Sequence, residues 1–370
     1  MNKTFSNGII VGAVCATILE LGLVTVSMNS GVLGLKDIAK VNAIAKAVKG
    51  NYYLDISDEE IMDGVLKGIF LNTDDYSTYY TADEVDKLLT TMNGETLCGI
   101  GISYSRTRYT GDYAAIYVHP GSPAEKAGIQ PQDIILSVDG TPIIDLELDE
   151  VRELVRGELG TPIELEILRG FDVFTVTAIR DVVDIKNAVS ERVSKDTGYI
   201  HITNFGSGLA DLMKNYLEDF KDCKNIIIDV TANPGGDLES LKATLDLLIP
   251  KCRICTLDTA AGNQEVIEVP NGTELKHNFI ILADDTSASC AELLVGVFKD
   301  YKYGTIIGGT TFGKGVWQTF IPFREGDAIK ITFGEYLLPN GESIHEKGVS
   351  PDIESETPYE TALEYLGEEV

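Results

Sequence analysis

From residue 184 onward, short apolar segments alternate with amphipathic ones, and this alternation restricts the fold more than any other feature of the sequence. Residues 225–230 and 279–283 are continuous apolar runs, which is the pattern of strands buried on both faces. The intervening segments have the three- and four-residue apolar spacing of helices. We therefore predict strands at residues 199–202, 225–230, 279–283 and 305–307, and helices at residues 210–220, 238–248 and 289–301. Such alternation predicts an α/β layer structure over residues 184–365, with functional loops at the strand ends.

Two of these strands end in loops that lead directly into helices. The first loop reads DVTANPGG at residues 229–236, and the second reads DDTSASC at residues 284–290. Ser289 then stands at a helix N-terminus, where unpaired N–H groups and the helix dipole favour developing negative charge. Consecutive glycines at positions 235 and 236 let backbone N–H groups approach a substrate closely. Together these features suit an acyl-transfer nucleophile beside an oxyanion hole.

Lys314, in the segment TFGKG at residues 311–315, is the candidate base for such a serine. A lysine acts as a base only when it is neutral, so burial must lower its pKa. Gln318 lies four residues on in an alternating segment, and an even spacing on a strand puts it on the face of Lys314. Its neutral amide can orient the amine without the charge that would hold the lysine protonated. Taken singly, Ser289 would be a helix cap and Lys314 a solvated loop residue.

Residues 97–181 have a different pattern, of short alternating strands and Gly-rich turns. We predict strands at residues 99–102, 113–118, 133–138, 163–168 and 174–179, and helices at residues 123–128 and 148–156. The segments GSPAEKAGI at residues 121–129 and DIILSVDG at residues 133–140 resemble a PDZ domain. That resemblance implies that the loop formed by Gly99, Ile100, Gly101 and Ile102 binds the C-terminal carboxylate of a peptide, which adds a strand to the sheet edge. An unrelated β domain with a tight turn is the alternative.

The N-terminal part contains an apolar segment followed by a helical pattern. Residues 8–28 are mostly apolar, with Glu20 as the exception, and about 20 such residues span a bilayer as a helix. Because no Ala-x-Ala cleavage site follows, we expect a single-pass membrane anchor over residues 1–30 rather than a removed signal peptide or a buried helix. The catalytic part is then expected outside the cytoplasm. Residues 35–92 have helical apolar spacing and are expected to form a small helical module.

Composition excludes several classes of partner and cofactor. The 58 acidic residues outnumber the 30 basic ones, for a net charge of −28, which argues against nucleic acid because phosphates require a basic surface. Six scattered cysteines do not form a disulfide framework. Cys252 and Cys255 fall on opposite faces of a strand-like stretch, so we interpret their spacing as coincidental rather than as a redox or zinc pair. The four histidines show no ligand spacing, and we expect neither a metal nor a cofactor.

Taken together, the motifs are similar to those of the C-terminal processing peptidases, also called tail-specific proteases. The resemblance rests on NPGG at residues 233–236, SASxxE at residues 287–292 and TFGKGxxQ at residues 311–318, all following a PDZ-like segment, and it extends from about residue 38 to residue 360. It implies a crotonase/ClpP-like α/β core with an inserted β-sandwich-like PDZ domain, a homodimer built partly through the helical module, and protein or peptide substrates with free C-termini. It also implies site roles: Ser289 as nucleophile, Lys314 as base, Gln318 as the residue that orients the base, and the backbone N–H groups of Gly235, Gly236 and Cys290 as oxyanion donors.

Three features depart from the family pattern. Cys290 and Ala291 replace the usual Ala-Ser after the nucleophile, Gly309-Thr310 replaces a common Glu-Pro, and Thr231 replaces a common arginine. The Cys290 thiol therefore stands as an alternative reactive group beside the serine. Two other functions are open: a catalytically silent, anchored PDZ adaptor, and a crotonase-like acyl-CoA enzyme. The intact Ser289, Lys314 and Gln318 argue against the adaptor, and the sequence offers no basic loop for the nucleotide of an acyl-CoA.

Overall fold

The computed structural model describes residues 33–86, 98–106, 111–146, 148–183, 186–259 and 262–368. The predicted membrane segment, residues 8–28, lies outside these ranges. Within them, no helix combines the length and the apolar character needed to cross a bilayer. The chain divides into two compact units, Met1–Leu71 and Asn72–Val370, which we describe separately.

In the first unit, the described residues form two helices, α2 (Leu35–Asn51) and α3 (Asp58–Gly68). Ser57 caps α3: its Oγ accepts from Glu60 N at 3.1 Å, while the Glu60 carboxylate accepts from Ser57 N at 2.7 Å. The helices leave large apolar side chains exposed, among them Ile38, Val41, Ile44 and Val48 of α2 and Met62 and Val65 of α3. This unit therefore presents apolar surface that its own described residues do not bury.

The helical pattern predicted over residues 35–92 does not continue throughout that range. Residues Thr78–Tyr80 form strand β1 instead, which pairs antiparallel with β18 (Ala328–Leu337). The reason is tertiary: Tyr79 is buried and its hydroxyl donates to Asp327 Oδ2 at 3.0 Å, so side-chain burial and pairing with β18 override the local helical spacing.

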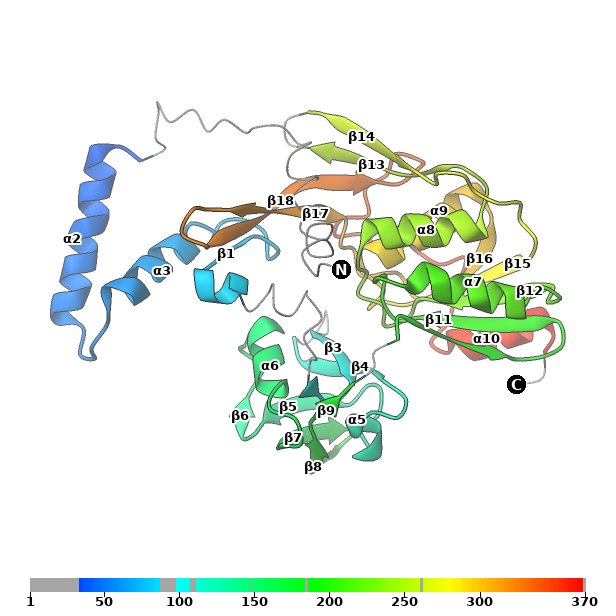
Figure 1. Cartoon of the computed structure of the whole chain (residues 1–370), viewed down its shortest axis with the longest axis horizontal. Coiled ribbons are helices and arrows are strands. Elements are labelled where there is room, and N and C mark those ends of the chain that lie inside the picture. The colour runs from blue at the N-terminus through cyan, green and yellow to red at the C-terminus, as the bar shows by residue number, and fades with distance from the viewer. Residues whose placement is uncertain are drawn as a thin grey trace, which may run out of the picture. The chain divides into compact units, whose positions relative to one another are not determined.

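The PDZ-like segment folds around an antiparallel sheet with strand order β3-β4-β5-β7-β8 (Figure 1). Its core contains Ile135, Val138, Ile163, Leu165 and Ile167. The alternate residues Ile163, Leu165 and Ile167 are buried on one face of β7, as the period of a strand requires. The elements are β2 (Cys98–Gly99), β3 (Ile102–Arg106), β4 (Tyr113–Val118), α5 (Pro123–Lys126), β5 (Ile134–Val138), β6 (Thr141–Pro142), α6 (Leu148–Val155), β7 (Pro162–Arg169), β8 (Asp172–Ile179) and β9 (Asp181–Val182).

The α/β part is built on a six-stranded sheet with order β10-β11-β12-β15-β16-β19 (Figure 1). Neighbouring strands from β11 to β19 run parallel, and β10 is antiparallel to β11. Every strand and helix predicted for this region is present within a few residues. The elements are β10 (Ala188–Arg192), β11 (Thr197–Ile202), α7 (Leu209–Asp219), β12 (Asn225–Asp229), α8 (Leu238–Leu248), β15 (Asn278–Ala283), α9 (Cys290–Tyr301), β16 (Gly304–Gly308), β19 (Ile353–Glu354) and α10 (Pro358–Leu366).

Both faces of this sheet are buried, as its continuous apolar strands require. On β12, Ile226 and Ile228 face a core shared with α7, α8 and α9. Ile227, between them, faces a smaller core shared with Ala362 and Leu363 of α10. The sheet is thus fixed between two helical layers, and its strand ends are held in defined positions.

A second sheet, antiparallel and five-stranded, lines the other side of the functional loops. Its order is β1-β18-β13-β14, and β17 also pairs with β18. It comprises β1, β13 (Arg253–Thr259), β14 (Gln264–Glu268), β17 (Val316–Pro322) and β18. Strand β17 begins just after Lys314 and carries Gln318, so this sheet supports the part of the site expected to supply the base.

Candidate active site

The loops after β12 and β15 lie side by side because these parallel strands are neighbours and end at the same edge of the sheet. Several hydrogen bonds join the loops, among them the bond from Ala288 N to Asn233 O at 2.9 Å and the bond from Ser287 Oγ to Val230 O at 2.7 Å. Ser287 is completely buried. The sheet therefore brings the NPGG and SAS segments together at its strand ends, where the alternating pattern predicted functional loops.

Ser289 precedes the first residue of α9 and has an unusual backbone conformation, with φ 56° and ψ −117°. Such a conformation costs a non-glycine residue about 1–3 kcal/mol, so surrounding contacts must impose it. Its N–H donates to Glu292 Oε2 at 2.8 Å. The serine thus stands on a tight turn at the start of a helix, where its hydroxyl can be presented to a substrate.

Glu292 joins the nucleophile segment to the lysine segment. The side chain is completely buried and accepts four hydrogen bonds, from Ser289 N, Thr311 Oγ1, Gly313 N and Lys314 N, at 2.7–2.8 Å. One oxygen, Oε2, accepts from both Ser289 N and Lys314 N, so these two amides lie within two hydrogen-bond lengths of each other. Burial raises the pKa of Glu292, and the donors act in the opposite direction. A ring of donors is the environment that an ionised carboxylate requires.

The two glycines of NPGG differ in what their N–H groups contact. This corrects the prediction that the Gly235 N–H is an oxyanion donor. The Gly235 N–H donates to the buried Asn233 Oδ1 at 2.8 Å, so it is not available to an oxyanion. Gly235 is needed for close approach, because a Cβ there would lie 2.7 Å from Ser289 Cβ at a φ of 103°. The N–H groups of Gly236 and Cys290, in contrast, bond to no acceptor in the described part of the chain. These two amides flank the serine and remain candidates for an oxyanion hole.

Lys314 lies in an environment that favours its neutral form. Its pKa is lowered, first by burial and second by the nearby positive charge of Lys330, while Cys290, Glu292 and Asp74 act in the opposite direction. No ion pair joins Lys314 to a carboxylate among the described residues. Its Nζ lies over the ring of Tyr76, 4.8 Å from the ring centroid. The lowered pKa is the property that a lysine base needs.

Gln318 lies on β17 near Lys314 but is hydrogen-bonded to other groups. Its Nε2 donates to Thr332 Oγ1 at 3.3 Å and to Val316 O at 3.4 Å. Within the residues described, no hydrogen bond joins Gln318 to Lys314. The expected orientation of the amine by Gln318 therefore has no direct contact in this structure, and Thr332 of β18 holds the amide instead.

Cys290 lies in surroundings that disfavour its reactive thiolate form. It is buried, its Sγ donates to Gly236 O at 3.3 Å, and burial raises its pKa to about 12. A thiol with a raised pKa is a poor nucleophile, since the thiolate is the reactive form. Across the described ranges, no group of three or more His, Cys, Asp or Glu side chains is arranged to hold a metal ion.

In the PDZ-like part, the predicted carboxylate loop is built around a left-handed glycine. Gly101 has φ 76°, and a Cβ there would lie 2.5 Å from Ser122 Cβ. The Ile100 side chain is buried in the core, and Ile102 begins β3. The N–H groups of Ile100 and Gly101 bond to no acceptor in the described parts of the chain, whereas Gly99 belongs to strand β2. Consecutive unpaired amides of this kind suit a carboxylate.

Sequence reasoning missed three contributors to the site: Thr311, Thr332 and Tyr76. Thr311 Oγ1 both donates to Glu292 and accepts from Val349 N, so it fixes the buried carboxylate. Thr332 and Tyr76 come from segments far from Lys314 in the sequence. Only Thr311 had a local signal, because it opens the TFGKG segment.

Comparisons with known proteins show which family the chain resembles. A family model for peptidase family S41 matches residues 196–355, and one for the PDZ domain matches residues 116–169. The carboxy-terminal processing protease CtpA of Bacillus subtilis is 30% identical over 370 residues, which cover 97% of this chain and 78% of that protein. A probable CtpA-like serine protease of Staphylococcus aureus is 29% identical over 369 residues, covering 97% and 74%. The structure of the photosystem II D1 C-terminal processing protease matches with a TM-score of 0.70 at 22% identity, over 85% of this chain and 86% of that one.

The role of Glu292 can be tested by replacing its charge while keeping its shape. Glu292→Gln turns one acceptor oxygen into an NH₂ group that faces backbone donors, so we expect a lower melting temperature and a loss of peptidase activity of at least about tenfold. Asp246→Asn is the matched control, because Asp246 also accepts from backbone N–H groups, those of Asn271 and Gly272, but outside these loops. It should lower stability without changing kcat. Equal activities of Glu292→Gln and wild type would contradict the bridging role.

Proposed function

The chain belongs to peptidase family S41, the carboxy-terminal processing proteases, and on this premise we propose that Ser289 and Lys314 carry out its serine-type peptide cleavage. The observation that carries the proposal is the shared contact of Glu292 Oε2, which accepts from both Ser289 N and Lys314 N at 2.8 Å. One buried carboxylate therefore controls the positions of nucleophile and base together.

In the first half of the proposed reaction, neutral Lys314 removes the proton of Ser289 Oγ as that oxygen attacks the scissile carbonyl carbon. The negative charge moves to the carbonyl oxygen, where the free N–H groups of Gly236 and Cys290 can donate to it. The C–N bond then breaks, and the Lys314 ammonium gives its proton to the leaving amine. An acyl-enzyme on Ser289 Oγ remains.

In the second half, the same lysine accepts a proton from water as the water oxygen attacks the acyl carbon. The ester bond to Ser289 breaks, the serine oxygen regains a proton from Lys314, and the new carboxylic acid loses its remaining proton to the solvent and leaves as a carboxylate. Gln318 acts in this scheme through Thr332, whose hydroxyl it contacts, rather than by a hydrogen bond to the amine. Because its amide is uncharged, Gln318 adds no charge to the side of the site that β17 forms.

We propose that the PDZ domain gathers substrates by their free C-termini. The unpaired amides of Ile100 and Gly101 support this role, since a carboxylate needs such donors. The loop of residues 99–102 then acts as the carboxylate site, and the edge of β3 offers strand pairing to the substrate tail.

We further propose that the protein is anchored to the cell membrane by residues 8–28, with the catalytic part outside the cytoplasm. The support is the length and apolar composition of that segment.

The proposed domain boundaries are residues 1–30, 35–92, 97–181 and 184–365. The α/β core is proposed to be crotonase/ClpP-like, because its parallel strands lie between α7–α9 on one face and α10 on the other.

A homodimer built partly through the helical module is also proposed. Its support is the exposed apolar surface of α2, where Val41, Ile44 and Val48 recur at three- and four-residue spacing and are 36%, 55% and 40% exposed. Helices with such a face bury it against another helix.

The catalytic pair is tested by alanine substitution in the full chain, assayed in detergent with a fluorogenic peptide. Ser289→Ala and Lys314→Ala should each lower kcat by at least about 100-fold, because nucleophile and base act as a unit, while the melting temperature is retained. Cys290→Ala should keep most of the activity. Retained turnover in Lys314→Ala would rule out its role as base, and loss of activity in Cys290→Ala alone would indicate a thiol mechanism.

Tail recognition is tested with one protein substrate that carries either a free or an amidated C-terminus. Wild type should cleave the free form faster, and Gly101→Ala should reduce that preference because its Cβ would collide with Ser122. Gly121→Ala is the matched control: Gly121 has the same φ of 76° but no atom within 4 Å of an added Cβ. If blocking the C-terminus changes neither wild type nor variant, the loop does not read carboxylates.

The dimer is tested by sedimentation of the full chain in detergent. Ile44→Glu places a charge within the apolar face of α2 and should shift the protein toward monomer. Lys46→Glu introduces the same residue on the same helix outside that face, and should leave the mass unchanged. Equal masses for wild type and both variants would place any self-association elsewhere.

A further inference from the structure

We propose that Tyr76 is a positioning residue for Lys314: the face of its ring holds the ε-amino group in place and stabilises the ammonium form during proton transfer. This inference rests on the proposed role of Lys314 as the base and extends it to a residue outside the recognised motifs. The geometry is that of a cation–π pair. Lys314 Nζ lies 4.8 Å from the centroid of the Tyr76 ring, within the distance of about 6 Å at which such pairs attract.

The backbone around Tyr76 is held so that the ring has a defined position. Tyr76 N donates to Asp74 Oδ1 at 3.0 Å, and Ser77 N donates to Asp74 O at 3.3 Å, which closes a tight turn. The buried Ser77 then accepts from Thr332 N of β18 at 3.0 Å. Residues Thr78–Tyr80 continue as β1 along the same strand. The turn is therefore anchored to the sheet immediately after the aromatic residue.

Thr332 of β18 is hydrogen-bonded both to the segment that carries Tyr76 and to Gln318. Thr332 N bonds to Ser77 on the Tyr76 side, and Thr332 Oγ1 accepts from Gln318 on the β17 side. Tyr76 and Gln318 are thus positioned by one shared anchor. This explains how two segments far apart in the sequence remain in register around Lys314.

The charged groups around Lys314 act on its pKa, and the Tyr76 ring contacts its ammonium group. The charged and titratable groups that act on it are Lys330 of β18, Cys290 and Glu292 of α9, and Asp74 of the turn. Asp75 and Glu346 act in turn on Tyr76. Among the residues that the structure describes, no carboxylate oxygen forms an ion pair with Nζ, and Glu292 accepts its four hydrogen bonds from other donors. The ring of Tyr76, in contrast, lies directly against Nζ, 4.8 Å from it at the centroid, where its face attracts the ammonium.

A ring suits a base that must gain and lose a proton in each half-reaction. A paired carboxylate would hold the lysine protonated, because full charges attract strongly in a dry site. The ring quadrupole attracts the ammonium more weakly, so it steadies the charged form without preventing deprotonation. Tyr76 thereby limits how far burial and Lys330 lower the pKa of Lys314.

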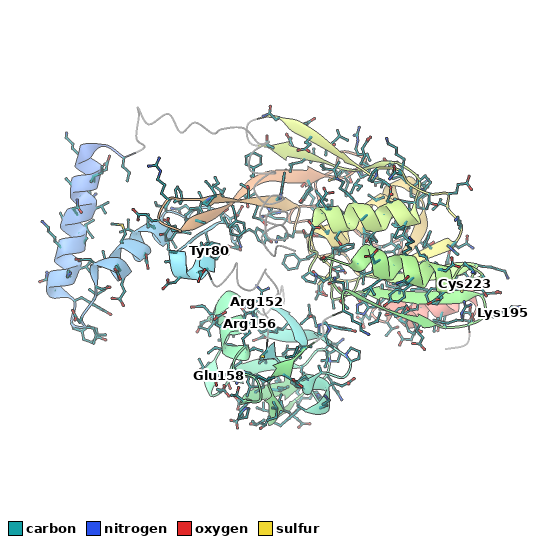
Figure 2. The ribbon with its side chains drawn as sticks, viewed as in Figure 1. Tyr80, Arg152, Arg156, Glu158, Lys195 and Cys223 are labelled. Atoms are coloured by element: carbon teal, nitrogen blue, oxygen red, sulfur yellow. The ribbon has the colours of Figure 1, made fainter. Side chains whose placement is uncertain are left out.

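A second aromatic residue provides a matched control. Tyr80, at the end of β1 (Figure 2), lies over the other lysine: its ring centroid is 5.6 Å from Lys330 Nζ. Removing that ring takes away the same kind of contact from the same segment but leaves the pair of Tyr76 and Lys314 intact.

The experiment measures kcat/KM of the full chain against pH for wild type, Tyr76→Leu, Tyr76→Phe and Tyr80→Leu, with a short peptide substrate. Activity requires neutral Lys314 and so rises with pH through its pKa. Without the ring the ammonium is less stable, the pKa falls, and the rise in Tyr76→Leu should move to lower pH by about half to one pH unit, the size of one cation–π contact. Tyr76→Phe keeps the ring and should keep the wild-type profile. Tyr80→Leu should not move the rise to lower pH.

The profile separates positioning from a merely structural role, which would lower activity at every pH alike. An unchanged profile in Tyr76→Leu, beside an inactive Lys314→Ala, overturns the role of Tyr76 and leaves the base intact. An active Lys314→Ala instead overturns the base assignment. An equal shift in Tyr76→Phe and Tyr76→Leu contradicts a role for the ring face.

A second measurement does not depend on turnover. In Ser289→Ala, selective isotope labelling of lysine lets NMR follow the titration of Lys314 directly. Adding Tyr76→Leu should lower that titration midpoint by a similar amount, and adding Tyr80→Leu should not lower it. If the midpoint of Lys314 is the same with and without the Tyr76 ring, the proposal is refuted. This readout does not require catalytic activity, which Ser289→Ala removes.

Discussion

The site depends on one buried carboxylate. Glu292 lies in the first turn of α9 with no exposed surface, and such a group is stable only when every part of it is hydrogen-bonded. Its four donors come from the serine turn and from the loop that carries the lysine, so desolvation is compensated only when both segments are in place. The N–H of Ser289, whose backbone conformation is unusual, is one of these four donors. The stability of the buried acid and the relative placement of Ser289 and Lys314, the proposed nucleophile and base, are therefore one constraint.

The six-stranded sheet makes that constraint possible. Because β12 and β15 are parallel neighbours buried on both faces, their ends meet at one edge and the two loops can bond to each other. The antiparallel sheet adds a second wall. Its strand β18 pairs with β17 and with β1, and so brings Gln318 and Tyr76 toward a lysine that neither adjoins in sequence. The reactive groups lie where elements from both sheets meet.

Much of the α/β part followed from the sequence alone. Continuous apolar runs such as residues 225–230 predict strands that are buried on both faces of a sheet. The helices predicted between these strands are present. The antiparallel strands were harder to predict. Strand β18 mixes buried and partly buried residues along its length and has no clear period, and residues 78–80 lie in a region of helical spacing. In both cases pairing partners distant in the sequence decide the conformation.

The sequence by itself determined the candidate residues for the chemistry: a serine at the start of a helix, a lysine between glycines, and the motifs that mark the family. These are local features, because the conformation of a turn and the start of a helix are set by a few adjacent residues. Only the tertiary structure decided which backbone donors remain free. The Gly235 amide bonds to Asn233, whereas those of Gly236 and Cys290 bond to no acceptor in the ranges that the structure describes. The tertiary structure also decided the surroundings of Lys314. A pKa depends on every charge, dipole and ring within a few ångströms, and these come from segments that the order of residues does not place together.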